Sequence, residues 1–228
     1  MLIKTIPVGM YQANCYIVID EETKDCIIVD PGEEASRIES VIESLDAKPK
    51  MILLTHGHFD HVGAVQKLAE KYKIPFYIDK KDEDMIERNV DVFGKLPKAG
   101  GYLKDGDMLK FSDNYEIKCL ETPGHTPGGL CFLIDNCLFT GDTLFRESIG
   151  RSDFEGGNHA TLLKSINDKL VPLGDDIAVY PGHGPSSTIK HERQRNPFLA
   201  GDLVQVALTR LLDMTFIKCL IYSILLRN

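Results

Sequence analysis

The stretch LLTHGHFDHVGA, residues 53–64, carries three histidines and one aspartate within six positions, namely His56, His58, Asp60 and His61. It follows an apolar segment typical of a buried strand and precedes a segment with the apolar spacing of a helix. A strand end followed by a tight turn directs successive side chains into one crevice. Imidazole and carboxylate groups are the ligands that zinc, manganese and iron accept. The stretch therefore predicts half of a metal site.

The spacing within this stretch favours two ions over one. His56 and His58 are two positions apart and project together at the strand end, whereas Asp60 and His61 lie at the start of the following helix. Four ligands in one short segment do not easily close on a single tetrahedral ion. We therefore expect the second pair to serve an ion a few ångströms from the first.

Three further candidate ligands follow predicted strands later in the chain and neighbour glycines, namely His125 in TPGHTPGG, Asp142 in FTGDTLF and His183 in YPGHGP. Glycine lets the backbone approach a bound ion closely. A single such residue is more often a turn former or helix cap than a ligand. The chain carries four such motifs at separate strand ends, counting the stretch with His56, and a chance origin would require four coincidences. Together the motifs therefore indicate one shared site.

The order T-H-x-H-x-D-H, His125, Asp142 and His183 resembles the metallo-β-lactamase superfamily over roughly residues 1–198. The resemblance implies an α/β fold, an αββα sandwich of two mixed sheets with helices on the outer faces. It also implies two divalent metal ions at one edge of the sandwich, with zinc as the first expectation and iron or manganese as the others.

The same resemblance distributes the ligands between the ions. The first would be held by His56, His58 and His125, the second by Asp60, His61 and His183, with Asp142 bridging them. The commonest zinc β-lactamases carry a cysteine at the bridging position. Asp142 therefore makes the chain similar to the glyoxalase II branch, in particular to short, single-domain relatives of hydroxyacylglutathione hydrolase, and argues against antibiotic hydrolysis.

Two residues outside this ligand set are further candidates. Asp30 ends a predicted strand, and the resemblance suggests that it orients a ligand imidazole through the free N–H; the alternative is a turn-forming aspartate before Pro31. Arg151 lies where glyoxalase II places a basic residue that meets the thiol carrier of the substrate. Its alternative is a solvated surface arginine.

The expected activity is metal-dependent hydrolysis of a small-molecule thioester such as S-acylglutathione. Metal binding lowers the pKa of water from about 15.7 to about 7, so that hydroxide is available at neutral pH. In this hypothesis hydroxide attacks the carbonyl between the two ions, and Asp60 acts as the catalytic residue that orients it.

Two other functions stay open. A persulfide dioxygenase would use one iron held, by resemblance, by His56, His125 and Asp142, and the stretch GRSDFEGG (150–157) favours it. A metal-stabilised scaffold without catalysis would join a partner through the C-terminal tail.

The composition indicates a globular protein with one main domain. The 228 residues carry 26 basic and 34 acidic side chains, a net charge of −8, which argues against nucleic acid as a partner. The six cysteines form no C-x-x-C pair and the N-terminus does not read as a signal peptide, so we expect a reducing cytoplasm.

Apolar patterns divide the chain into a domain over residues 1–199 and an apolar tail over 200–228. Strands and helices alternate through the domain, while the charged, glycine-containing stretch 80–106 is predicted to be an irregular loop. In the tail, residues 203–226 are apolar on nearly every helical face. The three charges of Arg210, Asp213 and Lys218 argue against a membrane span and favour a helix that packs or joins subunits into a homo-oligomer. A membrane-associated helix and a poorly ordered extension remain alternatives.

Overall fold

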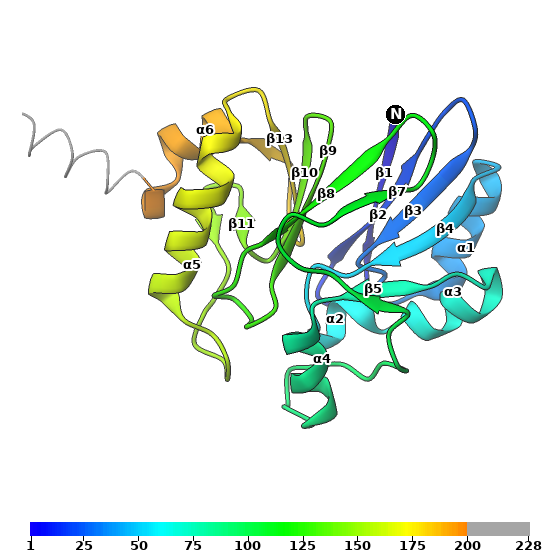
Figure 1. Cartoon of the computed structure of the whole chain (residues 1–228), viewed down its shortest axis with the longest axis horizontal. Helices are drawn as coiled ribbons and strands as arrows, with labels where there is room; N and C mark the ends of the chain where they lie inside the picture. The colour runs from blue at the N-terminus through cyan, green and yellow to red at the C-terminus, as the bar shows by residue number, and fades with distance from the viewer. Residues whose placement is uncertain (200–228) are drawn as a thin grey trace, which may run out of the picture.

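The structure, a computed structural model, describes residues 1–199 of the chain. Figure 1 shows two β-sheets packed face to face, with helices on the outer side of each sheet. This is the four-layer αββα order predicted from the sequence, and the fold prediction is confirmed. The predicted tail and its role in joining subunits lie outside the described residues.

The N-terminal sheet has the strand order β1-β2-β3-β4-β5-β6. Its first three strands are antiparallel, and the pairs from β3 onward are parallel. The strands are β1 (Leu2–Val8), β2 (Ala13–Ile19), β3 (Asp25–Val29), β4 (Lys48–Leu53), β5 (Phe76–Ile78) and β6 (Gly101–Tyr102).

The second sheet has the order β14-β13-β10-β9-β8-β7 and is antiparallel except for the parallel pair β10 and β13. Its strands are β7 (Met108–Lys110), β8 (Glu116–Glu121), β9 (Leu130–Ile134), β10 (Cys137–Gly141), β13 (Ala178–Pro181) and β14 (Ser187–Thr188). A short hairpin stands apart from both sheets and consists of β11 (Leu144–Phe145) and β12 (Ser148–Ile149).

The middle strands are apolar on both faces because each sheet is covered on both sides. In β2 every residue is buried, and its side chains alternate between two clusters as the twofold period of a strand requires. Ile17 packs toward the helices outside the N-terminal sheet, whereas Val18 packs against the second sheet with Phe132 and Phe139. A continuous apolar run thus forms a doubly covered strand.

The helices attach to the sheets through apolar faces. The helical segments are α1 (Ala35–Ser44), α2 (Phe59–Val62), α3 (Val65–Tyr72), α4 (Lys80–Glu87), α5 (His159–Ser165), η1 (Ile166–Leu170), η2 (Val171–Leu173) and α6 (Ile189–Arg195). Ile38 of α1 and Leu68 of α3 pack on the N-terminal sheet. Leu162 of α5 and Ile189 of α6 pack on the second sheet. None of the helices within residues 1–199 is long and apolar enough to cross a membrane.

The prediction of an irregular loop over residues 80–106 is wrong in its first part, since α4 occupies Lys80–Glu87. Asp79 caps this helix by accepting a hydrogen bond from the backbone N–H of Lys81. Lys80 pairs with Asp84 one turn later. Apolar periodicity misses a helix of this kind because its buried face includes the acidic side chains of Asp82 and Glu83.

The ends of several strands meet at one edge of the sandwich. The backbone N–H of Leu130 donates to the carbonyl of Thr55 (2.7 Å), which joins the second sheet to the end of β4. The N–H of Asn14 donates to the carbonyl of Gly182 (2.7 Å) and joins β2 to the end of β13. These bonds hold in register the loops that carry the candidate ligands.

Candidate metal centre

All seven predicted ligands meet at this edge of the sandwich. His56 and His58 follow β4, and Asp60 and His61 belong to α2. The other three come from loops after strands of the second sheet, namely His125 after β8, Asp142 after β10 and His183 after β13. A cavity of about 400 Å³ opens onto five of the seven. The convergence of separate strand-end motifs that the sequence predicts is present.

The first group of facing ligand atoms belongs to His56, His58 and His125, whose side chains are buried. The Nε2 atom of His125 lies 3.0 Å from the Nδ1 atom of His58. The Nδ1–H of His125 donates to the carbonyl of Arg151 (2.6 Å), which fixes the tautomer and leaves Nε2 as a lone pair directed inward. One ring nitrogen from each of the three histidines lies within 4.8 Å of the other two.

The second group consists of Asp60, His61 and His183. The Nε2 atom of His183 lies 3.3 Å from Asp60 Oδ2 and 3.3 Å from His61 Nε2. The Nδ1–H of His183 donates to the carbonyl of Tyr11 (3.1 Å), so in the neutral imidazole Nε2 carries the lone pair toward the group. Two nitrogens and one carboxylate oxygen meet here.

Asp142 lies between the two groups. Its Oδ1 is 3.5 Å from His61 Nε2 in the second group, and its Oδ2 is 3.6 Å from His125 Nε2 in the first and 3.6 Å from His183 Nε2. Asp142 therefore places a carboxylate oxygen within 3.6 Å of a histidine nitrogen of each group. This is the placement that a bridging ligand requires.

Asp30 lies behind the ligands and is buried. Its Oδ2 accepts from the Nδ1–H of His61 (3.2 Å) and from the hydroxyl of Thr55 (2.6 Å), whose oxygen in turn lies 3.0 Å from Nδ1 of His56. The Thr55 backbone N–H also donates to Asp30 Oδ1 (2.7 Å). The carboxylate therefore contacts one imidazole directly and a second through a hydroxyl, which is the contact that the predicted orienting role needs.

The buried polar atoms fit metal cations. Among residues 1–199, His56 Nε2 and Asp142 Oδ1 are buried side-chain atoms without a hydrogen-bond partner. A buried unpaired polar atom destabilises a fold by about 1–3 kcal/mol, so such atoms signal a missing partner. Both are electron-pair donors that face ligand groups, and nitrogen and carboxylate oxygen suit zinc, iron and manganese. The residues present thus fit divalent ions.

The electrostatics of the metal-free site separate its histidines into two kinds. Burial, together with neighbouring imidazoles, lowers the pKa of His58 to about 3 and that of His56 well below its usual range. Burial also opposes protonation of His61, yet the carboxylates of Asp142 and Asp30 raise its pKa to about 9. Despite burial, the hydrogen bond from His183 to Asp60 raises the pKa of His183.

These opposite shifts predict that the metal-free protein is most stable near pH 6.5. The pKa of His58 is lower in the folded than in the unfolded chain, so stability is lost as the pH falls from 6.5 toward 3. The pKa of His61 is higher in the folded chain, so its contribution is complete below pH 6.5 and is lost as the pH rises through 9. The alkaline loss should reach about 3 kcal/mol.

Chemical denaturation of the chelator-treated protein across this pH range tests the prediction. A His61→Gln variant should show a smaller alkaline loss, because only the contribution of His183 remains, and should keep the acidic loss. A wild-type profile that stays flat between pH 6.5 and 9 would contradict it.

The mouth of the site carries apolar and aromatic walls. Tyr11, Phe59, Val92 and Phe154 line the same cavity as the ligands, and the rings of Tyr11 and Phe59 make an edge contact with centroids 5.4 Å apart. The sequence marks aromatic residues as possible lining but does not separate them from core residues. The carbonyls of Tyr11 and Arg151, which fix two ligand tautomers, carry no sequence signal at all because any residue supplies one.

Arg151, predicted to bind substrate, lines this cavity, but its charge is partly engaged. Its Nε and one terminal nitrogen donate to the two carboxylate oxygens of Asp153 (both 2.8 Å), and its guanidinium stacks 3.7 Å from the ring centroid of Phe154.

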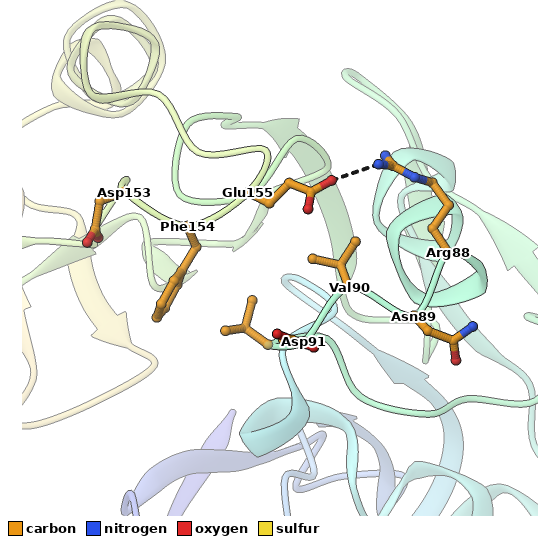
Figure 2. Close-up of a pocket in the computed structure, with 8 residues that line it drawn as sticks. Arg88, Asn89, Val90, Asp91, Asp153, Phe154 and Glu155 are labelled. Carbon is orange, nitrogen blue, oxygen red and sulfur yellow. Dashed lines mark hydrogen bonds and ion pairs between the residues drawn. The ribbon is translucent and has the colours of Figure 1, made fainter.

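A second cavity, of about 480 Å³, lies beside the first and shares Phe154 and Val92 with it. Figure 2 shows Arg88 and Glu155 paired across that cavity, with oxygen and nitrogen 2.7 Å apart.

Comparison with known proteins assigns the family. The profile of the metallo-beta-lactamase superfamily matches residues 8–183. The chain belongs to this superfamily. This is a superfamily of metallo-hydrolases, and the histidine and aspartate cluster implies divalent metal ions.

Individual metallo-beta-lactamase superfamily proteins resemble the chain over most of its length. "Hydroxyacylglutathione hydrolase GloC" of Haemophilus influenzae is 42% identical over 211 residues, which cover 87% of this chain and 98% of that protein. The crystal structure of the BLEG-1 B3 metallo-beta-lactamase is 34% identical with a TM-score of 0.81, covering 87% of this chain and 99% of the other. TTHA1623, crystallised in a di-iron-bound form, is 34% identical with a TM-score of 0.77, covering 86% and 100%.

Proposed function

We propose that the protein hydrolyses thioesters of small thiol carriers, with S-acylglutathione as the representative substrate. The observation that carries the proposal is the pair of facing ligand groups with Asp142 between them. The 42% identity to a protein named hydroxyacylglutathione hydrolase supports the choice of thioester. The candidate ligand atoms in both groups are nitrogen and oxygen, which suit the divalent ions that this hydrolysis requires.

In this proposal His56, His58 and His125 hold one divalent ion, and Asp60, His61 and His183 hold the other, with Asp142 shared. When bound, the ions supply a water of lowered pKa and polarise the substrate carbonyl. Zinc is the proposed metal, and iron remains compatible with the di-iron form of the related TTHA1623. Water adds to the thioester carbonyl, and the C–S bond breaks to give a carboxylic acid and a thiol.

Asp60 is the proposed catalytic residue. Burial opposes its ionisation, but in the metal-free site the hydrogen bond from protonated His183 and the charge of His61 lower the pKa of Asp60 to about 2. It is therefore ionised at neutral pH and lines the cavity, where it can accept a hydrogen bond from the attacking water and orient it. Tyr11, Phe59 and Phe154 offer apolar contact surface to a substrate at the cavity walls.

Arg151 is proposed to meet the thiol carrier. Its pairing with Asp153 and its stacking on Phe154 hold the guanidinium at the mouth of the cavity. A carboxylate of the carrier would compete with Asp153 for the two parallel N–H donors.

Three further proposals concern where the protein works and what it binds. We propose a cytoplasmic location and no nucleic-acid partner. We also propose a homo-oligomer joined through residues 203–226, which lie outside the described part of the chain.

The test is a substrate panel assayed with fully metal-loaded protein. S-acylglutathione should release free thiol, and a β-lactam and a phosphodiester should be poor substrates. Oxygen consumption with glutathione persulfide, without thioester turnover, would replace the proposal by the dioxygenase alternative. Inactivity across the panel with metal bound would favour the non-catalytic scaffold.

A further inference from the structure

Asp82 is a fully buried carboxylate that contributes no ligand atom to either group. It lies in the first turn of α4, within a run of charged residues that resembles a solvated helix face. A buried carboxylate needs strong hydrogen-bond partners to offset its loss of hydration. The groups that donate hydrogen bonds to Asp82 therefore indicate which segments its carboxylate fixes in place.

The two oxygens of Asp82 bind two different ligand-bearing loops. Oδ2 accepts from the backbone N–H of Gly57 (2.8 Å), which stands between His56 and His58. Oδ1 accepts from the N–H of Gly128 (2.7 Å), three residues after His125. One side chain thus links the loop after β4 to the loop after β8.

These are the two loops that supply the first ligand group. His58 and His125 approach within 3.0 Å, although 67 residues separate them in the chain. A ring nitrogen that shifts by a fraction of an ångström changes the geometry offered to an ion. The second group has its own carboxylate behind it, because Asp30 binds His61 directly.

Both loops approach α4 closely at a glycine. A Cβ atom on Gly128 would lie 2.7 Å from Asp82 Oδ1 and 2.8 Å from the Asp82 backbone nitrogen. A Cβ on Gly57 would lie 2.9 Å from Phe93 and 3.1 Å from Ile86 of α4. Glycine at position 128 lets its loop come this close to the carboxylate, and glycine at position 57 leaves room for Ile86 and Phe93.

We propose that Asp82 is a positioning residue that sets the spacing of His58 and His125 and so the affinity of the first ion site. The inference rests on the metal centre of the proposed function but not on its substrate. Asp82 acts through the backbones of Gly57 and Gly128, while Asp30 serves the second group. Asp30 also reaches His56 of the first group through the Thr55 hydroxyl, whereas Asp82 contacts only the loops of the first group.

The test is chelator competition on the metal-loaded full-length protein. In Asp82→Asn the side-chain amide turns an N–H toward one of the two backbone donors, so one link is lost. We expect one of two ions to bind about 10- to 100-fold more weakly and the other to bind as in the wild type. Asp30→Asn should weaken binding of the other ion most, with a smaller effect on the first ion through Thr55 and His56, and the double variant should weaken binding of both ions.

Asp79→Asn is the matched control. Asp79 is a buried aspartate of the same helix terminus that accepts from the N–H of Lys81, a cap that asparagine can also provide. Both ions should bind to this variant as to the wild type. Gly128→Ala, which displaces the loop without changing the carboxylate, should reproduce the selective weakening seen in Asp82→Asn.

The outcomes separate positioning from a purely structural role. Equal weakening of both ions, or unchanged affinities with lower stability of the metal-free protein, would overturn the proposal. So would failure of both Asp82→Asn and Gly128→Ala to fold. Since the readout is metal affinity, a selective loss would support the inference even if thioesters proved not to be the substrate.

Discussion

Replacement of Asp142 by alanine is expected to lower the proposed thioester hydrolysis by about 10³-fold or more. The Asp142 carboxylate has one oxygen 3.5 Å from His61 Nε2 and the other 3.6 Å from His125 Nε2, so its removal takes a ligand from both groups at once. The metal site would then lose one negative charge, so metal binding should weaken together with activity. Thiol release and metal content, measured on the same preparation, check both parts.

Asp135→Asn is a suitable control for that variant. Asp135 is exposed in the turn between β9 and β10 and adopts a left-handed conformation (φ 51°) that asparagine tolerates well. Its activity and metal content should match those of the wild type. Full thioesterase activity in Asp142→Ala would show that the mechanism proposed above is wrong.

Replacement of Gly182 by alanine should lower activity by about 10²-fold or more, although the glycine itself does no chemistry. A Cβ atom at this position would lie 2.2 Å from Asp142 Oδ1 and 2.8 Å from Cε1 of His61. The first distance is far shorter than any real contact, so the carboxylate must move out of its place between the groups. Steady-state kinetics and metal content should both report the displacement.

Gly184→Ala separates this steric effect from a general loss of stability. Gly184 has φ +74°, so alanine there is strained by about 1 kcal/mol, yet within the described residues nothing lies within 4 Å of its Cβ position. We expect lower stability with activity close to that of the wild type. If Gly184→Ala lost as much activity as Gly182→Ala, the steric argument for Gly182 would fail.

The fold and the ligands could be predicted because their signals are local. Four of the candidate ligands stand beside glycine at the end of an apolar strand, namely His56, His125, Asp142 and His183, so the pattern around each is visible in a few residues of sequence. The convergence of these strand ends follows from the layer order of the sandwich. The bridging position of Asp142 came from family resemblance, and the structure gives it the appropriate neighbours.

Apart from Asp30, which the family resemblance suggested, the supporting residues could not be predicted because their partners are distant in sequence. Asp82 lies in the run DKKDEDMIE, where composition favours solvent, yet its carboxylate reaches Gly57 and Gly128, 25 and 46 residues away. The pairing of Arg151 with Asp153 is local, but the contact of its carbonyl with His125 depends on the fold. Burial of charged groups is decided by tertiary contacts that no periodic pattern records.

The most direct test of the dinuclear site is the metal content of protein purified without added metal or chelator, measured by elemental analysis. Two groups of candidate ligand atoms with Asp142 between them predict about two divalent ions per chain. Substitution of ligands in both groups should lower the content of both ions. About one iron per chain and little other metal would contradict the account. It would then reduce Asp60, His61 and His183 to supporting residues and favour the dioxygenase.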